Sequence, residues 1–483
     1  MPQEPSGKDV RFIHVLLPIL FLLVLIIYGL ILQPQVFNKE AFPLEIVFLL
    51  ATVFSSAHLI IIGFSWDTIQ KAIVKKLAKG FPAVLILFAI GLVIATWIVS
   101  GTIPMLIYYG IKIINPTYMY ALAFLIPVLF STLTGTSWGS VGTIGTVIIG
   151  IAAAVDAHLG ITAGAIIGGA FMGDKMSPLS DTTNLAAIAT DVNLYDHIRS
   201  MMYTTLPSAV IALILFFILG FTHPPALETV TGAETVAMLE SIDGMFNFNL
   251  LLLLPPLLVL FGSLKKMATL PTLLASSILS CILALIFQGF DIGNIMTVLK
   301  SGFDTTMAPW VTVVPEKVQV LFNRGGLFEL NEVIVFTLMA LTFIGTIDVT
   351  NAMPRIVNRV FGFAKTRAAV ILASLGSTAF TNAITSNQSA TSFIVGDAFK
   401  ATYDRFKIPR KVLSRSIEDY GTMIESLIPW SATALFMSAT LGVAYADYWH
   451  WQFLSLINIV IAPLIAILGI GCFYKKNDDT KNS

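Results

Sequence analysis

The distribution of apolar residues predicts a chain that crosses a membrane many times. Apolar segments of about 20 residues, the length needed to cross a hydrocarbon core of roughly 30 Å, recur along almost the whole sequence. The first, Phe12 to Leu32, is too long for the apolar region of a signal peptide and has no small-residue cleavage site behind it, so we interpret it as a retained helix. The predicted spans are 11–33, 43–63, 82–108, 159–185, 202–222, 248–263, 269–290, 328–352, 412–443 and 451–473.

Two further apolar regions, 118–156 and 368–399, do not fit a simple crossing. Basic segments flank the second region, so both of its ends are expected on the same side of the membrane. Two limbs of about 14 residues would reach roughly 21 Å each, which is short of the hydrocarbon core. The centres, Ser131 to Gly145 and Thr381 to Ser389, are too polar to face lipid, and such backbone is tolerated only inside protein or along a cavity. We therefore predict two re-entrant hairpins.

Composition agrees with this pattern and narrows the function. The chain of 483 residues is 56% hydrophobic and 12% charged, whereas soluble proteins carry about 25% charged residues. The net charge is zero, which gives no reason to expect a nucleic-acid partner. Basic residues gather in 64–81, 353–367 and 400–415, at Lys265-Lys266 and in the tail, whereas the 223–247 loop is acidic. The positive-inside rule therefore places both termini in the cytoplasm.

Short sequence matches at a nearly constant offset indicate an internal repeat. About 245 residues separate Gly101-Thr102-Ile103 from Gly345-Thr346-Ile347, Ser131-Thr132 from Ser377-Thr378, and Gly173-Asp174 from Glu418-Asp419. The charge-derived topology runs the two copies in opposite senses, as in inverted-repeat transporters, whose substrate site lies at the midplane between the repeats. The predicted units are N-terminal helices 1–81, repeat 82–222, a connecting region 223–327, repeat 328–473 and a cytoplasmic tail 474–483. The predicted fold is an all-α polytopic membrane protein with about ten transmembrane helices and two re-entrant hairpins.

Each repeat contains a helix that is expected to break near the midplane. In 159–185, Gly173 weakens the helix and Pro178 removes a backbone donor, and in 412–443 a polar segment precedes Pro429. Breaks expose carbonyl groups and helix termini that can bind ions. A carboxylate at the bilayer centre costs about 2.5–3.5 kcal/mol, so it must be protonated, paired or bound to a cation. The acidic residues concerned are Asp174, Asp181, Glu418, Asp419 and Glu425.

The residue types around these carboxylates favour an alkali cation. Serine, threonine and asparagine oxygens are hard ligands, and Lys175 can neutralise only one acidic group. The candidate Na⁺ ligands are Asp174, Asp419 and Glu425, and no cofactor or catalytic residue is expected. The candidate lining residues are Thr136, Ser137, Lys175, Ser177, Thr182, Asn184, Asn382, Thr385, Ser386 and Asn387.

Structural roles stay open for some of the acidic residues. Asp181 can act as a helix cap over Thr183, and Glu418 can pair with Arg415 near the membrane surface. Asp348, near the end of a span, can be a cap or a ligand.

Two functions of other classes are less favoured. The segment Gly135-Thr136-Ser137-Trp138-Gly139 matches the G-x-S-x-G pattern of hydrolases. That pattern requires a strand–turn–helix context and a partner histidine, so we do not expect an intramembrane hydrolase or any other enzyme. A passive cation channel is also less favoured, because inverted repeats around carboxylates are typical of alternating access.

The run from Gly169 to Leu185, together with the hairpin tip Gly135 to Ser140, resembles the signature of the NhaC family of Na⁺/H⁺ antiporters. The resemblance covers nearly the whole chain and implies Na⁺-linked antiport in a bacterial plasma membrane. The family belongs with the ion transporter superfamily, which includes dicarboxylate carriers with paired hairpins. Some relatives exchange malate and protons for lactate and Na⁺, so an organic-acid antiporter that uses Lys175 and the hairpin tips is the alternative. A homodimer is left open.

The expected mechanism is competition between Na⁺ and protons for the same carboxylates. Burial raises the pKa of a carboxyl group and a bound cation lowers it, so one ion displaces the other. Either loaded state neutralises the site and permits an elevator-like or rocking transition, whereas the empty charged site resists it.

Overall fold

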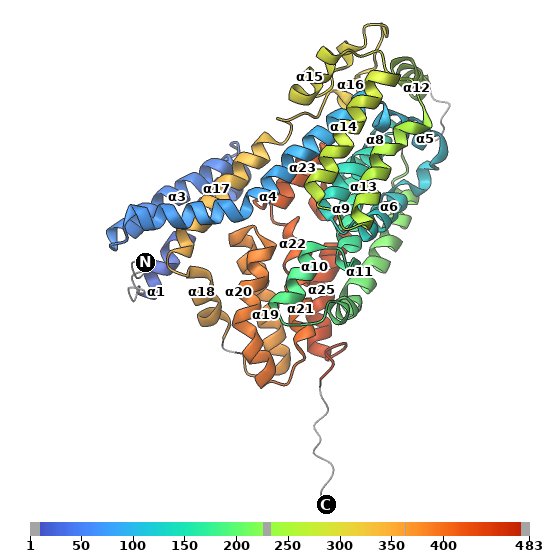
Figure 1. Ribbon diagram of the computed structural model, residues 1–483. Coiled ribbons are helices and arrows are strands. Elements are labelled where there is room, and N and C mark those ends of the chain that lie inside the picture. Colours follow the sequence, from blue (N-terminus) through green and yellow to red (C-terminus); the bar gives the residue numbers. More distant parts are fainter. Residues whose placement is uncertain (1–9, 226–232, 363, 475–483) are drawn as a thin grey trace, which may run out of the picture.

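The computed structural model describes residues 10–225, 233–362 and 364–474, and within these ranges the chain forms helices and connecting segments without a strand (Figure 1). Nine helices of the described chain are long and apolar enough to cross a membrane, or up to eleven if each of two bent helix pairs is one span. The predicted all-α polytopic membrane fold is therefore confirmed. The inverted repeat and the domain boundaries stay predictions.

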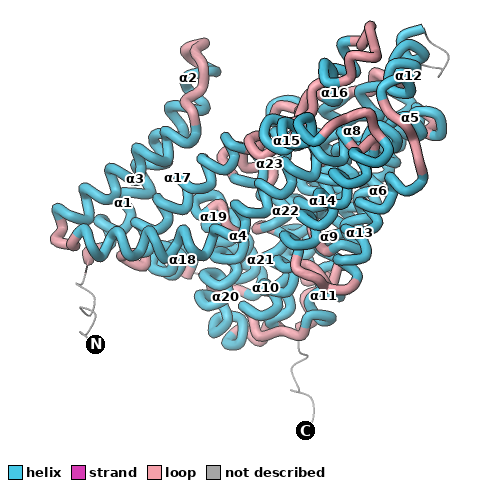
Figure 2. Tube along the Cα trace, turned by 45° about the horizontal axis from the view of Figure 1, so that its top comes forward, coloured by secondary structure: helices cyan, strands magenta, loops and turns pink. Residues whose placement is uncertain are grey.

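The N-terminal helices form an arm with a helix from the second half of the chain. Helix α1 (Phe12–Ile26) continues through a π-turn to Gln35, and α3 (Leu44–Ile61) follows. Helix α17 (Asn331–Asp348) packs against α3 and α4 (Trp66–Val99). Figure 2 shows this arm extending to one side of the helices that hold the hairpins.

Most of the segment 64–81, expected as a basic loop, is helical, and α4 (Trp66–Val99) therefore starts well before the predicted start of a span at residue 82. Helix α4 begins after Ser65, whose hydroxyl accepts a hydrogen bond from the Thr68 amide at 3.2 Å. The lysines of its first turns are exposed or half-buried, whereas Ile69 is buried. The lysines of the segment 64–81 therefore mark the part of helix α4 that lies outside the apolar layer, and not a loop. The basic segment 353–367 likewise contains α18 (Ala352–Phe361).

The predicted span 82–108 is interrupted. Helix α4 ends at Val99, and α5 (Thr102–Ile113) begins after Gly101. Gly101 has a φ of 86°, in the left-handed region that glycine adopts without a steric penalty. The apolar run conceals this break, because glycine does not lower the hydropathy that defined the span.

Both regions predicted to be re-entrant form helical hairpins, and the hairpins extend from opposite ends of the molecule (Figure 1). The first limb of the first hairpin is α6 (Met119–Thr134). The second limb is one helical segment made of α7 (Ser137–Ser140), a π-turn and α8 (Thr146–Ala154). The His158 amide donates a hydrogen bond to the Tyr120 hydroxyl at 3.0 Å, so the two limbs share one end.

The second hairpin consists of α19 (Arg367–Thr385) and α20 (Gln388–Arg405). The Arg367 side chain donates to the Phe406 carbonyl at 3.0 Å, which brings its ends together. The limbs have 19 and 18 residues, about 28 Å at 1.5 Å per residue, so the predicted limb length was wrong. The apolar region ended at residue 399 because the last turns of α20 are polar although still helical.

Both predicted helix breaks are confirmed. The first lies between α9 (Leu159–Met176) and α10 (Asp181–Ala189). The second divides 410–441 into α21 (Arg410–Asp419), α22 (Thr422–Glu425) and α23 (Ala432–Leu441). The remaining helices are α11 (Leu194–Thr222), α12 (Ala233–Met245), α13 (Leu254–Leu264), α14 (Thr269–Phe287), α15 (Ile292–Ser301), α16 (Glu316–Phe322), α24 (Tyr445–Tyr448) and α25 (Phe453–Leu468). Glu228 of the acidic loop and the basic tail residues Lys475 and Lys476 lie outside the described residues.

Helices α6 and α9 approach closely through glycines of α9. A Cβ atom at Gly169 would lie 2.1 Å from the Phe124 carbonyl oxygen, and one at Gly173 would lie 2.4 Å from the Val128 carbonyl oxygen. Small residues four positions apart permit such backbone contact between membrane helices. The first hairpin is therefore fixed against the helix that carries the first break.

We expect the substitution Gly169→Ala to lower the thermal stability of the purified protein in detergent. The added methyl group must displace the α6 backbone, and overpacking of this kind costs about 1–3 kcal/mol. The control is Gly376→Ala in α19, where the nearest atom to the new Cβ would be Phe361 Cε1 at 3.4 Å. That change should leave the unfolding temperature unchanged or raise it, because alanine favours the helix by about 0.5–1 kcal/mol. An equal loss in both variants would contradict the packing argument.

Candidate functional site

The two hairpin tips and both helix breaks meet around one cavity of about 720 Å³. Its wall includes 134–138 of the first tip, 385–389 of the second tip and 178–182 of the first break. Thr422 and Glu425 of the second break line it as well, with further residues of α4, α17 and α23. The exposed segment 266–269, at the turn from α13 into α14, also lines the cavity, which therefore reaches the surface of the molecule on that side.

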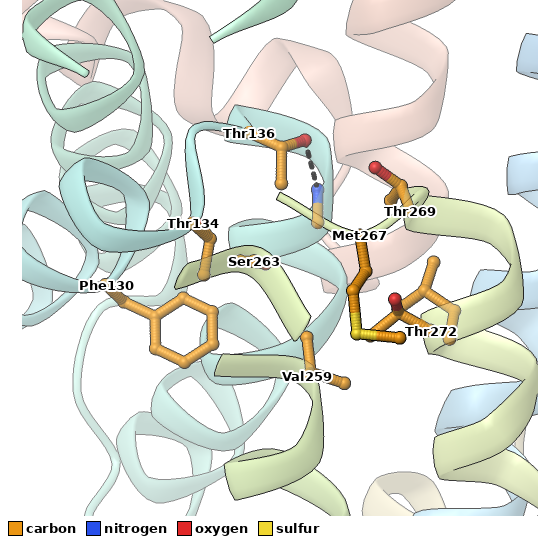
Figure 3. A pocket seen from close by; sticks show the side chains of 10 residues that line it. Phe130, Thr134, Thr136, Val259, Ser263, Met267, Thr269 and Thr272 are labelled. Atoms are coloured by element: carbon orange, nitrogen blue, oxygen red, sulfur yellow. Dashed lines mark hydrogen bonds between the residues drawn. The ribbon is translucent and has the colours of Figure 1, made fainter. Parts of the chain in front are cut away.

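A small side pocket adjoins the cavity at the first hairpin tip (Figure 3). Figure 3 shows Phe130 and Thr134 of α6 on one side and Val259 and Met267, from α13 and the loop after it, on the other. At the tip, the Gly139 amide donates to the Thr136 hydroxyl at 3.2 Å, which caps the second limb. The first tip therefore faces the α13–α14 pair directly.

Several helices begin at the cavity wall. The hydroxyl of Ser180 caps α10, the side chain of Asn387 caps α20 and the hydroxyl of Ser431 caps α23. The residues directly after these caps line the cavity. Helix N-termini carry partial positive charge, so they offset some of the negative charge of the acidic side chains in the wall.

Three of the predicted acidic residues lie at the cavity. Asp174, in the last turn of α9, is 4% exposed, and Glu425, at the end of α22, is 8% exposed. Asp181 is the first residue of α10 and is exposed to the cavity. Because Ser180 caps this helix, the cap position is not occupied by Asp181.

Lys175 connects the two breaks through a buried ion pair. Its side chain is fully enclosed, and its Nζ lies 2.8 Å from Glu418 Oε2 and 3.5 Å from Asp174 Oδ2. Lys175 also donates to the Thr182 hydroxyl at 2.8 Å, and Thr422 donates to the same Glu418 oxygen at 2.9 Å. Glu418 thus pairs with Lys175, deep in the protein. The predicted pairing of Glu418 with Arg415 near the membrane surface is wrong, because Arg415 lies next to Asp419 instead.

Asp419 lies apart from the cavity. Its Oδ1 accepts hydrogen bonds from Thr204 at 2.9 Å and Asn458 at 3.1 Å, and its Oδ2 lies 4.0 Å from the Arg415 guanidinium. The structure therefore does not bring Asp419 together with Asp174 and Glu425, as the predicted set of Na⁺ ligands requires. Asp348 forms an ion pair with Lys76 at 3.0 Å and does not reach the site.

Most of the predicted lining residues do line the cavity, namely Thr136, Ser137, Thr182, Asn184, Thr385, Ser386 and Asn387. Lys175, Ser177 and Asn382 are instead buried outside its wall. Lys266, Gln388 and Thr422 also line the cavity, although none of them was among the predicted lining residues. The polar run around the second tip gave a signal for Gln388, whereas nothing local indicates that the α13–α14 loop reaches the cavity.

Comparisons with known proteins agree on one family. The family model described as the Na⁺/H⁺ antiporter family matches residues 169–470. The chain is 37% identical over 454 residues to an uncharacterized Na⁺/H⁺ antiporter of Haemophilus influenzae, covering 94% of this chain and 95% of the relative. It is 34% identical to the Na⁺/H⁺ antiporter NhaC of Alkalihalophilus pseudofirmus, covering 89% and 90% of the two chains. It is also 31% identical to a malate-2H⁺/Na⁺-lactate antiporter of Bacillus subtilis, covering 98% and 99%.

The substitution Lys175→Met is expected to destabilise the protein strongly. It leaves Glu418 buried without its cation, and removal of one partner of a buried pair costs about 3–5 kcal/mol. Thermal unfolding in detergent should show the loss, and Glu418→Gln in the same chain should restore much of it. The control Lys400→Met removes a cation whose partners Asp191 and Asp397 are exposed, so it should cost about 1 kcal/mol or less. A double variant as unstable as Lys175→Met alone would show that the pair does not carry the effect.

Proposed function

The chain belongs to the Na⁺/H⁺ antiporter family, and we propose that it exchanges Na⁺ for protons through the cavity between the two hairpin tips. One observation carries the proposal: Asp174, Glu418 and Glu425 are buried at the two breaks, and Lys175, the lysine buried beside them, pairs with Asp174 and Glu418. One ammonium group neutralises one of three carboxylates. The remaining negative charge requires protons or a bound cation inside the membrane.

Asp174 and Glu425 are the proposed exchange pair. Each lies at the end of a helix segment from a different half of the chain, and both line the same cavity, with Ser137 and Thr433 hydroxyl groups in the wall. Carboxylate and hydroxyl oxygens suit Na⁺ as hard ligands. Na⁺ and protons compete for the two carboxylates, and only a loaded pair is neutral enough to pass from one side of the membrane to the other.

The cavity faces the cytoplasm in this proposal. Its mouth carries Lys266, and the positive-inside rule assigns the basic end of the α13–α14 pair to the cytoplasm together with both chain termini. The membrane is the bacterial plasma membrane, as the organisms of the relatives support. The protein acts as a transporter and not as an enzyme, because Ser137 of the hydrolase-like pattern lies in a hairpin between helices.

Exchange of an organic acid is the second candidate. The cavity volume of about 720 Å³ is far larger than one Na⁺ ion needs, and the N-termini of α10, α20 and α23 lie at its wall. Helix N-termini favour anionic groups such as a substrate carboxylate. One relative carries malate and lactate in its name, which supports this chemistry for the family without assigning it to this chain.

We expect Asp174→Asn to abolish Na⁺-driven proton movement in liposomes that enclose a pH-sensitive dye. The amide cannot exchange a proton and no longer attracts the cation. Asp397→Asn is the matched control, because Asp397 is exposed on α20 and pairs with Lys400 at the surface, and it should exchange at the wild-type rate. Exchange by Asp174→Asn at the wild-type rate would remove this residue from the mechanism. Proton movement by the wild type only after addition of malate or lactate would favour the second candidate.

Glu425→Gln is expected to weaken apparent Na⁺ affinity at least tenfold, which corresponds to about 1.4 kcal/mol. The substitution retains the shape of the side chain but removes one of the two charges that hold the cation. The same liposome assay over a series of Na⁺ concentrations gives the half-saturating value. Glu332→Gln, at an exposed position in the first turn of α17, should leave that value unchanged. Unchanged Na⁺ dependence in both variants would show that Glu425 does not bind the ion.

A further inference from the structure

Helix α4 is longer than a membrane crossing requires. It has 34 residues, which extend over about 51 Å, whereas the hydrocarbon core of a bilayer is roughly 30 Å thick. Its apolar part, 82–99, alone reaches about 27 Å, which is close to that thickness. The preceding segment 66–81 contains four lysines, at positions 71, 75, 76 and 79, so it requires an environment other than lipid chains.

One side of this segment packs against the end of α17. A Cβ atom at Gly345 would lie 2.6 Å from the Ile73 Cα atom, so the two backbones are in direct contact. The Lys76 ammonium group forms an ion pair at 3.0 Å with Asp348, the last residue of α17. Helix α17 is itself long and apolar enough to cross a membrane. Its last turn is therefore expected at the level of the lipid headgroups, and the α4 segment beside it at the same level.

The opposite side of the segment carries two parallel rows of exposed side chains. The first row is basic and consists of Lys71, Lys75 and Lys79. The second row is apolar and consists of Val74, Ala78 and Phe81. Within each row the residues are three or four positions apart, so they share one face of the helix. The two rows are about 100° apart around the helix axis and thus lie side by side.

Two lysines of the basic row have no counter-charge within the described part of the chain. Lys71 pairs with Asp67 at 2.6 Å, whereas Lys75 and Lys79 form no ion pair or side-chain hydrogen bond with a described residue. Like charges four positions apart on a helix repel each other, so the row destabilises the isolated helix. Packing does not require lysine on this exposed face. An anion outside the chain would remove the repulsion.

The two rows together fit an anionic phospholipid. A helix with lysines on one face and large apolar residues beside them lies in the membrane interface, where it is attracted to anionic lipids. Trp66, the first residue of α4, is 54% exposed, and tryptophan is enriched at the same level of a membrane. The apolar row can contact the acyl chains while the lysines contact phosphate groups. A soluble acidic protein satisfies only the lysines, whereas a phospholipid satisfies both rows.

We propose that the outward face of 66–81 binds anionic phospholipids, with Lys75 and Lys79 as the contacts to the headgroups. The inference does not depend on which ion or acid the protein exchanges. A lipid bound there holds α4, and through the Lys76–Asp348 pair the end of α17, at a fixed depth in the membrane. Because Gly80 and Ala83 of the same helix line the cavity, the lipid also fixes one side of the cavity wall.

Quenching of Trp66 fluorescence by brominated lipids tests the proposal, because Trp66 begins the same helix. The protein is reconstituted in phosphatidylcholine vesicles that contain an increasing fraction of brominated phosphatidylglycerol or of brominated phosphatidylcholine. The Trp66 signal is the difference between each protein and the same protein with Trp66→Phe. Phosphatidylglycerol should quench at a lower fraction than phosphatidylcholine. Lys75→Gln with Lys79→Gln should remove most of this preference, about fivefold for each lysine.

Two control variants separate the basic row from charge in general. Lys39→Gln with Lys407→Gln removes two exposed lysines elsewhere and should retain the preference, as should Lys75→Arg with Lys79→Arg, which keeps the charge. Equal quenching by the two lipids in the wild type would overturn the proposal. A preference retained without Lys75 and Lys79, or lost equally in the first control, would overturn it as well. The unfolding temperature in detergent shows whether each variant is folded. If the double glutamine variant does not fold, the two single variants replace it, each with a fivefold loss expected.

Discussion

The buried ammonium group of Lys175 is the interaction on which the arrangement of the site depends. It is fully enclosed, and it contacts Glu418 of the second break and Thr182 beyond its own break. A buried charge is tolerated only with a partner, so the ends of α9 and α21 must stay together. Because Thr422 donates to the same carboxylate oxygen, the second break is fixed on both of its sides. The two broken helices therefore form one unit around which the hairpin tips are placed.

The two hairpins are attached to that unit by different means. In the first half, Gly169 and Gly173 bring the α9 backbone against α6, where dispersion and close contact replace the hydrophobic effect that lipid does not provide. In the second half, amide nitrogens of Asn382 and Gln388 hold the backbone of the break by hydrogen bonds. The first hairpin is thus held by backbone contact, and the second by side-chain hydrogen bonds.

Local signals in the sequence predicted the hairpins and the breaks, because glycine, proline and a polar tip act on their own neighbourhood. They did not predict which neighbour each acidic side chain faces. Glu418 and Asp419 are consecutive and therefore point about 100° apart on a helix. One meets Lys175 and the other meets Thr204 and Asn458, from helices that are distant in sequence. The basic segment 64–81 shows a related limit: charge reports distance from the lipid core, but the backbone there is helical.

In the proposed exchange, the charge balance of the cavity favours a cation first and an anion only after that cation is bound. The buried carboxylates exceed the buried lysine, which favours protons or Na⁺, while several helix N-termini at the wall supply partial positive charge. Once a cation neutralises Asp174 and Glu425, the positive ends of α10, α20 and α23 are no longer offset. The loaded cavity is then suited to a carboxylate group, whereas the empty one repels it. Binding of an organic anion would thus depend on prior binding of Na⁺ or protons, and the same wall residues can serve simple cation exchange or cation-dependent exchange of an acid.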